Sequence, residues 1–253
     1  MPESPDVKYM SMLIENMFRN HDIQNIVDIE TTDPIRDIEY PLRIIGVHTK
    51  GKVTWIECVD SLLIPAYIKI TYGLNGSIKE TSDNWKIKFT CDSGPESTFE
   101  WYYCGGLFGG VTIELNMNAA DRLGIDILDP ITEESKRIVL HSMKRHNRMN
   151  VCGMLLQQDI LCGIGNYLKS EILFACGISP HAKIGCIPDL KLIEMYEKAN
   201  EISFMLLDCL LSEKSCKRHL KVYQKSICDG NPVVSEKIRG RQTFWIPELQ
   251  KFC

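Results

Sequence analysis

The stretch GMLLQQDILCGIGNYLKSEILFACGISP, residues 153–180, decides the fold of the second half of this chain. Its apolar residues recur at helical spacing on both sides of Gly163-Ile164-Gly165-Asn166, which predicts two helices joined by a glycine turn. Glycine lets the backbone approach a phosphate closely, and the N–H groups and dipole of a helix N-terminus favour an anion. The turn is therefore a candidate phosphate site, built from the backbone of Gly163 and Gly165 and the side chain of Asn166.

Outward from this stretch, the pattern predicts an α+β protein in which helical and β-rich segments are kept apart. An amphipathic helix is expected just after Ser4-Pro5, and short β-rich runs between glycine turns over residues 40–115 indicate a β-sandwich or barrel. Thr132 is placed as the N-cap of a helical half over residues 133–211, and the chain ends on a β pattern with D-G-N-P and R-G turns.

Three domains follow from this pattern. We expect a β-sandwich domain over residues 1–128, a helical domain over residues 133–215 and a terminal β-hairpin over residues 216–253.

Composition is that of a globular protein, with a net charge of −4 that taken alone counts against nucleic acid. The basic residues are concentrated in residues 135–158 and 212–242, however, which suggests a face turned towards a polyanion; solvated helix faces explain the same charges equally well. The eleven cysteines include no C-x-x-C pair and no export signal precedes them, so most are expected to be reduced, buried hydrophobes in an intracellular, reducing compartment: nucleus, cytoplasm or viral factory.

The first residues, MPESPDV, carry a second candidate site. If Met1 is removed, Pro2 presents a secondary amine, and because an α-amino group titrates near pH 8 against about 10.4 for lysine, roughly a tenth is unprotonated at neutral pH. Such an amine can attack a sugar C1′ and form a cationic iminium, while Glu3 beside it moves protons. The alternative is that Met-Pro-Glu is simply a common beginning.

Together the two segments resemble a known family. GIGNYLKSEILF is similar to the helix–two-turn–helix segment of the Fpg/Nei DNA glycosylases, and Met-Pro-Glu is that family's other hallmark. KVYQK and GRQTFWIP resemble the Nei-like branch most, nearest to vertebrate Nei-like proteins two and three. The resemblance covers essentially the full chain, and in the middle of the sandwich it is one of pattern only.

The resemblance implies a role for each matching residue. Pro2 would be the Schiff-base nucleophile and Glu3 the catalytic acid and base. Four further groups would hold DNA phosphates: Lys52, with Lys50 as the alternative if the register slips, Asn166 with the Gly163–Gly165 backbone, and Arg241. Glu171 matches a carboxylate near the family's site, with a solvated helix position as the alternative.

The side chains that fill the space left by a rotated nucleotide match less completely. YGLNGSIK resembles the loop that supplies an apolar wedge, with Leu74 at its tip, although a core position is the competing interpretation. The family's R-R-F-G loop corresponds to CGGLFGG, in which Phe108 is kept and the arginine is missing. This departure leaves room for action on single strands or bubbles.

A further departure concerns zinc, which often holds the terminal hairpin of related proteins. Ile246 and Leu249 occupy two of the ligand positions, and Pro232 stands where the nearest relatives have a histidine, so that only Cys228 remains. One thiolate cannot make a tetrahedral site, and we predict a zinc-free hairpin held by packing of side chains 244–246. A site from Cys216, His219, Cys228 and Cys253 is the remote alternative.

The resemblance thus implies a cofactor-free, monomeric glycosylase and lyase that removes oxidised bases from duplex or single-stranded DNA and cleaves abasic sites by β- and δ-elimination. Two other hypotheses remain open. The same fold without catalysis would bind DNA or RNA, and a scaffold with a basic face for a protein partner would explain the charge distribution but not the N-terminal motif.

Overall fold

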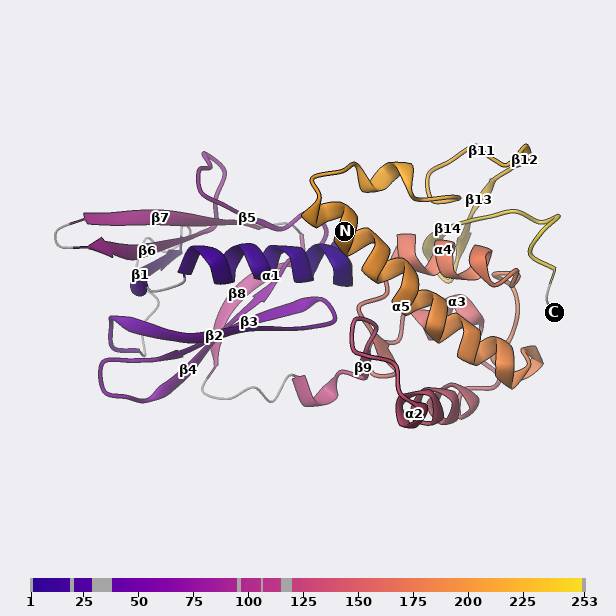
Figure 1. Ribbon diagram of the computed structural model, residues 1–253, viewed down its shortest axis with the longest axis horizontal. Helices are drawn as coiled ribbons and strands as arrows, with labels where there is room; N and C mark the ends of the chain where they lie inside the picture. Colours follow the sequence, from indigo (N-terminus) through magenta and orange to yellow (C-terminus); the bar gives the residue numbers. More distant parts are fainter. Residues whose placement is uncertain are drawn as a thin grey trace. The chain divides into compact units, whose positions relative to one another are not determined.

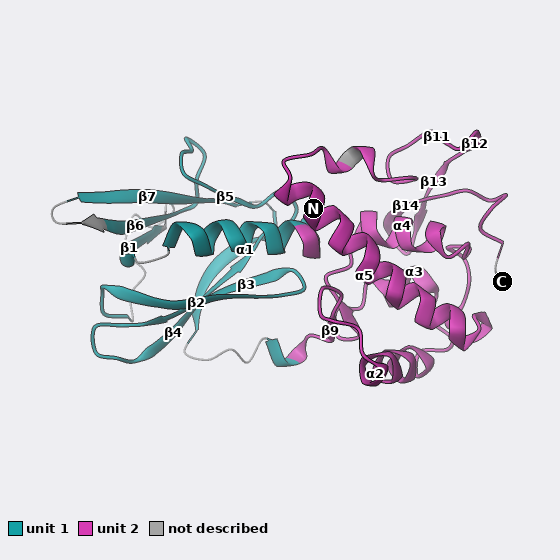
Figure 2. Ribbon diagram, viewed as in Figure 1, with its two compact units in different colours: residues 1–2, 6–121 teal, residues 3–5, 122–253 magenta. Residues whose placement is uncertain are grey.

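A computed structural model of the chain describes residues 2–18, 21–28, 38–94, 97–105, 107–114 and 120–251. The chain forms two units, shown in Figure 2. The first contains Met1–Pro2 and Asp6–Asp121, and the second contains Glu3–Pro5 and Arg122–Cys253. The terminal hairpin belongs to this second unit, so a separate third domain over residues 216–253 stays a prediction.

The first unit contains a helix and eight strands. They are α1 (Ser4–Phe18), β1 (Asp22–Asp28), β2 (Leu42–Lys50), β3 (Val53–Val59), β4 (Pro65–Thr71), β5 (Ser77–Lys79), β6 (Ile87–Gly94), β7 (Ser97–Cys104) and β8 (Gly110–Glu114). Their hydrogen-bonded order is β5-β7-β6-β1-β2-β3-β4-β8, and neighbouring strands are antiparallel. Figure 1 shows this sheet folded into two layers, as expected for a β-sandwich.

Helix α1 belongs to the core of this sandwich. Val7, Ile14 and Phe18 lie on one face of α1 and are buried with apolar side chains of the sheet. The Phe18 ring stacks on Trp101, with ring centroids 4.6 Å apart. The predicted N-terminal helix is confirmed, and its burial fixes the direction in which the chain leaves residues 2–5.

Strand β1 was not predicted, because the sequence pattern assigned strands only from residue 40 onwards. The strand lies between β6 and β2 and joins the two layers into one sheet. Ile23 and Ile26 are both fully buried although they are three residues apart, since the register shifts between Ile23 and Asn25. This β-bulge removes the two-residue alternation by which a strand is recognised in a sequence.

The second unit is mainly helical. Its elements are β9 (Ile125–Asp126), α2 (Glu133–Lys144), α3 (Val151–Leu155), β10 (Leu161–Cys162), α4 (Asn166–Ala175), α5 (Asp189–Leu211), β11 (Ile227–Cys228), β12 (Asn231–Pro232), β13 (Val234–Ile238) and β14 (Arg241–Trp245), with 3-10 turns at Ala120–Arg122, Ile184–Cys186 and Cys216–Arg218. Thr132 caps α2 as predicted, through a reciprocal pair of hydrogen bonds with Ser135. Helix α4 packs against both α5 and β14, and the α+β class is confirmed.

The segment before the glycine turn differs from its prediction. The helical run expected up to Gly163 ends at Leu155, and Leu161–Cys162 instead pair in parallel with Ile125–Asp126. The side chain of Gln158 makes this turn possible: its amide donates to the carbonyl of Ile164 and accepts from the N–H of Gly163, both within 3.1 Å. These bonds replace the backbone partners that a continuous helix would have supplied.

The structure also shows which of the basic residues are paired with acidic ones and which of the cysteines are buried. In α2, Lys136 and Arg137 are paired with glutamates, and Lys144 is paired with Asp189, so this basic run is largely neutralised within the protein. Seven of the ten described cysteines are buried, which confirms that most act as small hydrophobes. None of the described helices has the length and apolar character to cross a bilayer.

Candidate active site

The two candidate segments of the sequence meet in the second unit, at the start of α4. The Glu3 side chain is 1% exposed, and its carboxylate accepts three backbone hydrogen bonds: from Gly165 at 2.8 Å, Tyr167 at 2.9 Å and Leu168 at 3.0 Å. These N–H groups belong to the first turn of a helix, where the donors have no partner within the helix and the dipole is positive. The site therefore favours an anionic carboxylate at this position.

Two glycines make room for the N-terminal segment. A Cβ on Gly165 would lie 2.5 Å from Cδ of Glu3, and a Cβ on Gly163 would lie 2.5 Å from Cβ of Ser4. Gly163 also has a φ of +103°, a region that L side chains rarely adopt. The glycines are thus required by the approach of residues 3 and 4, one through space alone and the other through space and backbone conformation.

This arrangement corrects one expectation from the sequence. The N–H of Gly165 is occupied by Glu3 and the N–H of Gly163 by Gln158, so these amides do not point to an open phosphate site. The reasoning about an anion at the helix N-terminus was sound, but the anion is a carboxylate of the same chain. Asn166, half-exposed at the first position of α4, is the predicted phosphate ligand whose side chain remains at the surface.

Three residues that hold this site were missed by sequence analysis. Ser4 donates its backbone N–H to the carbonyl of Gly163 at 3.0 Å and its hydroxyl to Asp126 at 3.1 Å. Asp126 is buried and also accepts from the N–H of Leu128, which fixes its carboxylate. The partners are 122 residues apart in the chain, and together with Gln158 they had no local pattern that could have revealed them.

Glu171 is not exposed to solvent, and its carboxylate binds other backbone groups than those that bind Glu3. Its carboxylate is buried and accepts from the N–H groups of Lys221, Val222 and Tyr223, at 2.8, 3.0 and 2.8 Å. Burial raises the pKa of Glu171, while the three backbone N–H groups lower it. The alternative of a solvated helix position is wrong, and the side chain instead fixes the segment that leads into the terminal hairpin.

Arg241 lies at the exposed tip of that hairpin. It is the first residue of β14 and pairs with Ile238, while Arg239 and Gly240 form the turn, both with positive φ. A two-residue turn of this kind matches the twist of the two strands and fixes their register. The hairpin therefore presents the Arg241 guanidinium to solvent from a defined backbone position.

The described residues of the hairpin region do not fit a zinc ion. No group of three or more His, Cys, Asp or Glu side chains comes together among them. Ile246 is fully buried and forms an apolar cluster with Val222 and Cys228, against which Phe244 packs, and Leu249 lies at the surface. Cys253, one member of the remote alternative site, lies outside the described residues.

In the first unit, the predicted phosphate lysines lie at the tight turn between β2 and β3. Lys50 is the last residue of β2 and pairs with Val53, so that Gly51, with a φ of +59°, and Lys52 form the turn itself. The ammonium of Lys50 donates to the carbonyl of Ala120 at 3.3 Å. Lys52 is half-exposed at the tip of the turn.

The two predicted wedge residues lie on neighbouring loops of the same unit. The N–H of Leu74 donates to the carbonyl of Leu107 at 3.0 Å, and a Cβ on Gly73 would lie 2.5 Å from the backbone nitrogen of Gly109. Leu74 is half-exposed, whereas Phe108 is 85% exposed and has a φ of +64°. The structure thus brings the two predicted loops together, with one large aromatic side chain fully presented to solvent.

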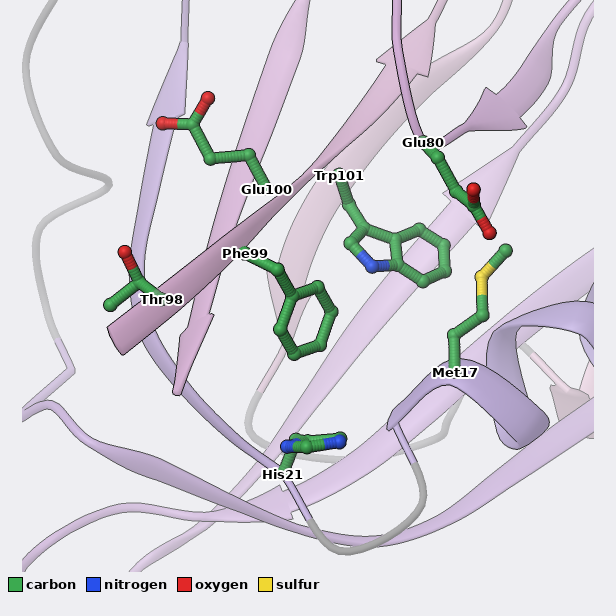
Figure 3. Close-up of a pocket in the computed structure, with 7 residues that line it drawn as sticks. All are labelled: Met17, His21, Glu80, Thr98, Phe99, Glu100 and Trp101. Atoms are coloured by element: carbon green, nitrogen blue, oxygen red, sulfur yellow. The ribbon is translucent and has the colours of Figure 1, made fainter. Parts of the chain in front are cut away.

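The sandwich also has a hollow of about 700 Å³, lined by Met17, His21, Glu80, Thr98, Phe99, Glu100 and Trp101. Figure 3 shows the Glu100 carboxylate directed away from the rings of Phe99 and Trp101. That carboxylate is bonded to Lys88 and Tyr102 instead. Neither Pro2 nor Glu3 lines this hollow, so it is not the site of the two candidate motifs.

The fold and the buried N-terminal glutamate define a class of two-unit α+β proteins, and solved structures share this fold. The chain superposes with a TM-score of 0.82 on MutM in complex with carbocyclic 8-oxo-G-containing DNA, at 17% identity over 99% of this chain and 100% of that one. A viral DNA glycosylase gives a TM-score of 0.81 at 19% identity, over 98% of this chain and 99% of that one.

Sequence comparison points the same way. The chain is 28% identical to formamidopyrimidine-DNA glycosylase of Carboxydothermus hydrogenoformans, over 99% of this chain and 100% of that protein. It is 30% identical to endonuclease 8-like 3 of Mus musculus over 81% of its residues, and spans about a third of that protein, 34%. No family model matches. In sequence the chain is thus similar to formamidopyrimidine-DNA glycosylases and to endonuclease 8-like 3, and its fold is that of the MutM structure.

Proposed function

We propose that this chain is a DNA glycosylase of base excision repair that removes oxidised bases and cleaves the resulting abasic site as a lyase. The observation that carries the proposal is the position of Glu3. Glu3 follows Pro2 in the sequence and is buried. Three backbone N–H groups at the start of α4 donate hydrogen bonds to its carboxylate. A fixed carboxylate next to an N-terminal secondary amine is the pair that such chemistry requires.

In the proposed reaction, the unprotonated nitrogen of Pro2, freed by loss of Met1, attacks C1′ of the damaged nucleotide. The glycosidic bond breaks, its electron pair leaves with the base, and the base takes up a proton. The C1′–O4′ bond then breaks, O4′ takes up a proton delivered through Glu3, and the ring opens to an iminium between Pro2 and C1′, which withdraws electrons from C2′. No metal or organic cofactor takes part.

Glu3 then accepts the proton from C2′, and the C3′–O bond breaks in the β-elimination. A second, δ-elimination breaks the C5′–O bond, and water releases Pro2 from the remaining sugar fragment. Three N–H donors and a helix dipole keep the Glu3 carboxylate ionised and in a fixed position, so that it is available to accept a proton when the substrate arrives. The same donors make it a weaker base than a free carboxylate.

The DNA contacts are proposed residue by residue. Asn166 and Arg241 would each bind a phosphate, and Lys52, with Lys50 as the alternative, would bind another beside the lesion. Leu74 and Phe108 would enter the stack in place of the rotated nucleotide. Oxidised pyrimidines, hydantoins and formamidopyrimidines are the proposed lesions, in duplex or single-stranded DNA, with the protein acting as a monomer in a reducing compartment.

Borohydride reduction of the iminium tests the proposal. The protein, shown by intact mass to lack Met1, is incubated with an oligonucleotide containing one abasic site, and a matched sample has its N-terminus acetylated. We expect a covalent protein–DNA band that disappears in the acetylated sample. The absence of a band, with DNA binding intact, would assign the chain to the non-catalytic binding proteins of this fold.

A further inference from the structure

One buried charge has no part in the proposed reaction. Lys169, in the first turn of α4, is 0% exposed, and its ammonium donates to the backbone carbonyl of Gln242 in β14 at 3.2 Å. Lysine is almost never fully buried unless it is paired, because desolvation of the ammonium is costly. A methionine would fill similar space without this cost, so packing alone gives no reason for a lysine here.

The neighbours of Lys169 in α4 also bind the terminal segment through its backbone. The Ser170 hydroxyl accepts from the N–H of Phe244 at 3.3 Å and donates to the carbonyl of Asn166, and Glu171 accepts from three N–H groups of residues 221–223. Three consecutive buried side chains of α4 thus bind backbone groups of β14 and of residues 221–223, the segment that precedes the hairpin.

The bonds to β14 fall on one edge of that strand. Gln242 and Phe244 are two residues apart, and in an antiparallel strand residues of equal parity direct their N–H and C=O groups to the same side. Since α4 side chains occupy these groups, this is the edge that β13 does not cover. An uncovered strand edge is mobile and open to wrong pairing, and Lys169 and Ser170 close it beside Arg241.

The charges around Lys169 link the same helix to the candidate site. Burial lowers the pKa of Lys169, the nearby Cys152 and Glu3 raise it, and Arg241 lowers it. The ammonium therefore lies in the electrostatic fields of both the proposed base and the proposed phosphate ligand. Within six residues, α4 holds Glu3 by its N–H groups and the hairpin by its side chains.

We propose that Lys169 is a positioning residue: its buried ammonium fixes the outer edge of β14 against α4 and so sets the place from which Arg241 reaches DNA. The attachment of β14 to α4 through Lys169 can be tested in the protein alone, while its consequence for DNA binding rests on the proposed function.

Hydrogen exchange of single amides tests the hold without DNA. In Lys169→Met, we expect the protection of the Phe244 amide to fall about tenfold, as loss of a charged hydrogen bond would give, with α5 amides unchanged. Lys198→Met, which removes a lysine paired with Glu201 on α5, should leave the Phe244 amide protected as in the wild type. Unchanged protection in Lys169→Met overturns the proposal. If α5 amides also exchange faster, the protein has lost its core, and Lys169→Gln, which keeps a polar side chain but not the charge, is read instead for the same selective loss at Phe244.

Binding to an oligonucleotide with an abasic-site analogue tests the consequence. We expect Lys169→Met to weaken binding by the same factor as Arg241→Ala, and the double variant to be no weaker than either, since both remove one contact. In Lys169→Met the single-turnover rate at saturating DNA should equal that of the wild type, because only binding is affected; a general loss of structure would lower this rate as well. Additive losses would show that Lys169 does not act through Arg241. If the wild type binds no DNA, the proposed function fails, and the exchange result still decides the hold on β14.

Discussion

The candidate functional side chains at the start of α4 and at the loop tips around Leu74 and Phe108 differ in their exposure to solvent. Glu3 is 1% exposed and bonded to three backbone amides, whereas Phe108 is 85% exposed on a backbone of positive φ. The first region fixes a charged group that would be costly to bury without partners. The second exposes an apolar group that would be stabilised by burial.

The difference separates two kinds of task. A proton acceptor must be held at a set position before the substrate arrives, so its surroundings are complete in the isolated protein. A side chain that enters a base stack finds its partners only in the complex, and so it stands exposed in the isolated protein. We therefore expect substitutions in the first region to change the rate of the reaction, and substitutions in the second to change how the protein engages DNA.

The largest effect is expected from Glu3→Gln. The amide keeps the size of the side chain but cannot accept the C2′ proton, so single-turnover cleavage of abasic DNA should fall by about 10²–10⁴, the usual contribution of a general base. Binding should change little, because Glu3 makes no proposed contact to phosphate. Glu201→Gln, which changes an exposed glutamate of α5, is the control. A rate within twofold of wild type, about 0.4 kcal/mol, would remove Glu3 from the reaction.

Gly165→Ala tests whether the position of the carboxylate matters as much as its presence. Gly165 has a φ of −129°, which alanine adopts without strain, so the effect is due only to the new Cβ, which would lie 2.5 Å from Cδ of Glu3. A displacement near 1 Å is expected to slow the single-turnover rate about 10²-fold. In Gly110→Ala the new Cβ meets nothing within 4 Å, and this variant should behave as wild type. Equal rates in the two variants would mean that the site tolerates movement of Glu3.

The prediction from sequence succeeded for features that are determined by residues close together in the chain. The helix periodicity of α1, the Thr132 cap and the glycine turn before α4 each lie within a few residues, and each was found. The phosphate expected at the backbone of the glycine turn was wrong, because the Glu3 carboxylate occupies the N–H of Gly165. This role of Glu3 could not be read from spacing, because the partners are about 160 residues apart and nothing local connects them.

The prediction failed where tertiary contacts override local preference. Strand β1 has a bulge that breaks its alternation, and the helix before the glycine turn ends early because the Gln158 side chain satisfies the turn. Lys169 reads in the sequence as an ordinary surface residue of an amphipathic helix. Only the packing of β14 on α4 makes it a buried charge.

The loop tips should respond to truncation through DNA alone. Phe108→Ala is expected to change the free energy of unfolding by less than about 0.5 kcal/mol, since the ring makes few contacts in the protein. Leu74→Ala, at a half-exposed position, should cost somewhat more. On duplex DNA with a single lesion, both should reduce base release several-fold, and on the same lesion in a single strand much less, because no stack has to be opened there. Equal losses on both substrates would exclude a wedge role.

The buried and exposed cysteine thiols also differ, and here we expect the smallest effect, a dependence of folding stability on pH. Burial raises the pKa of Cys58 and of Cys91 from 9.0 to about 12, so the unfolded chain loses these protons before the folded protein does. The folded state then binds more protons between pH 9 and pH 12, and its stability must fall as the pH rises through that range, by about 1 kcal/mol per thiol and pH unit at most. Urea unfolding of wild type and of Cys58→Ala/Cys91→Ala at pH 8 and pH 10 measures this directly. The stability difference between the two pH values should shrink in the double variant, while Cys186→Ala, at an exposed position, should keep the wild-type difference. If all three proteins lose the same stability, the buried thiols ionise as freely as exposed ones, and the sandwich core is less well sealed than its packing indicates.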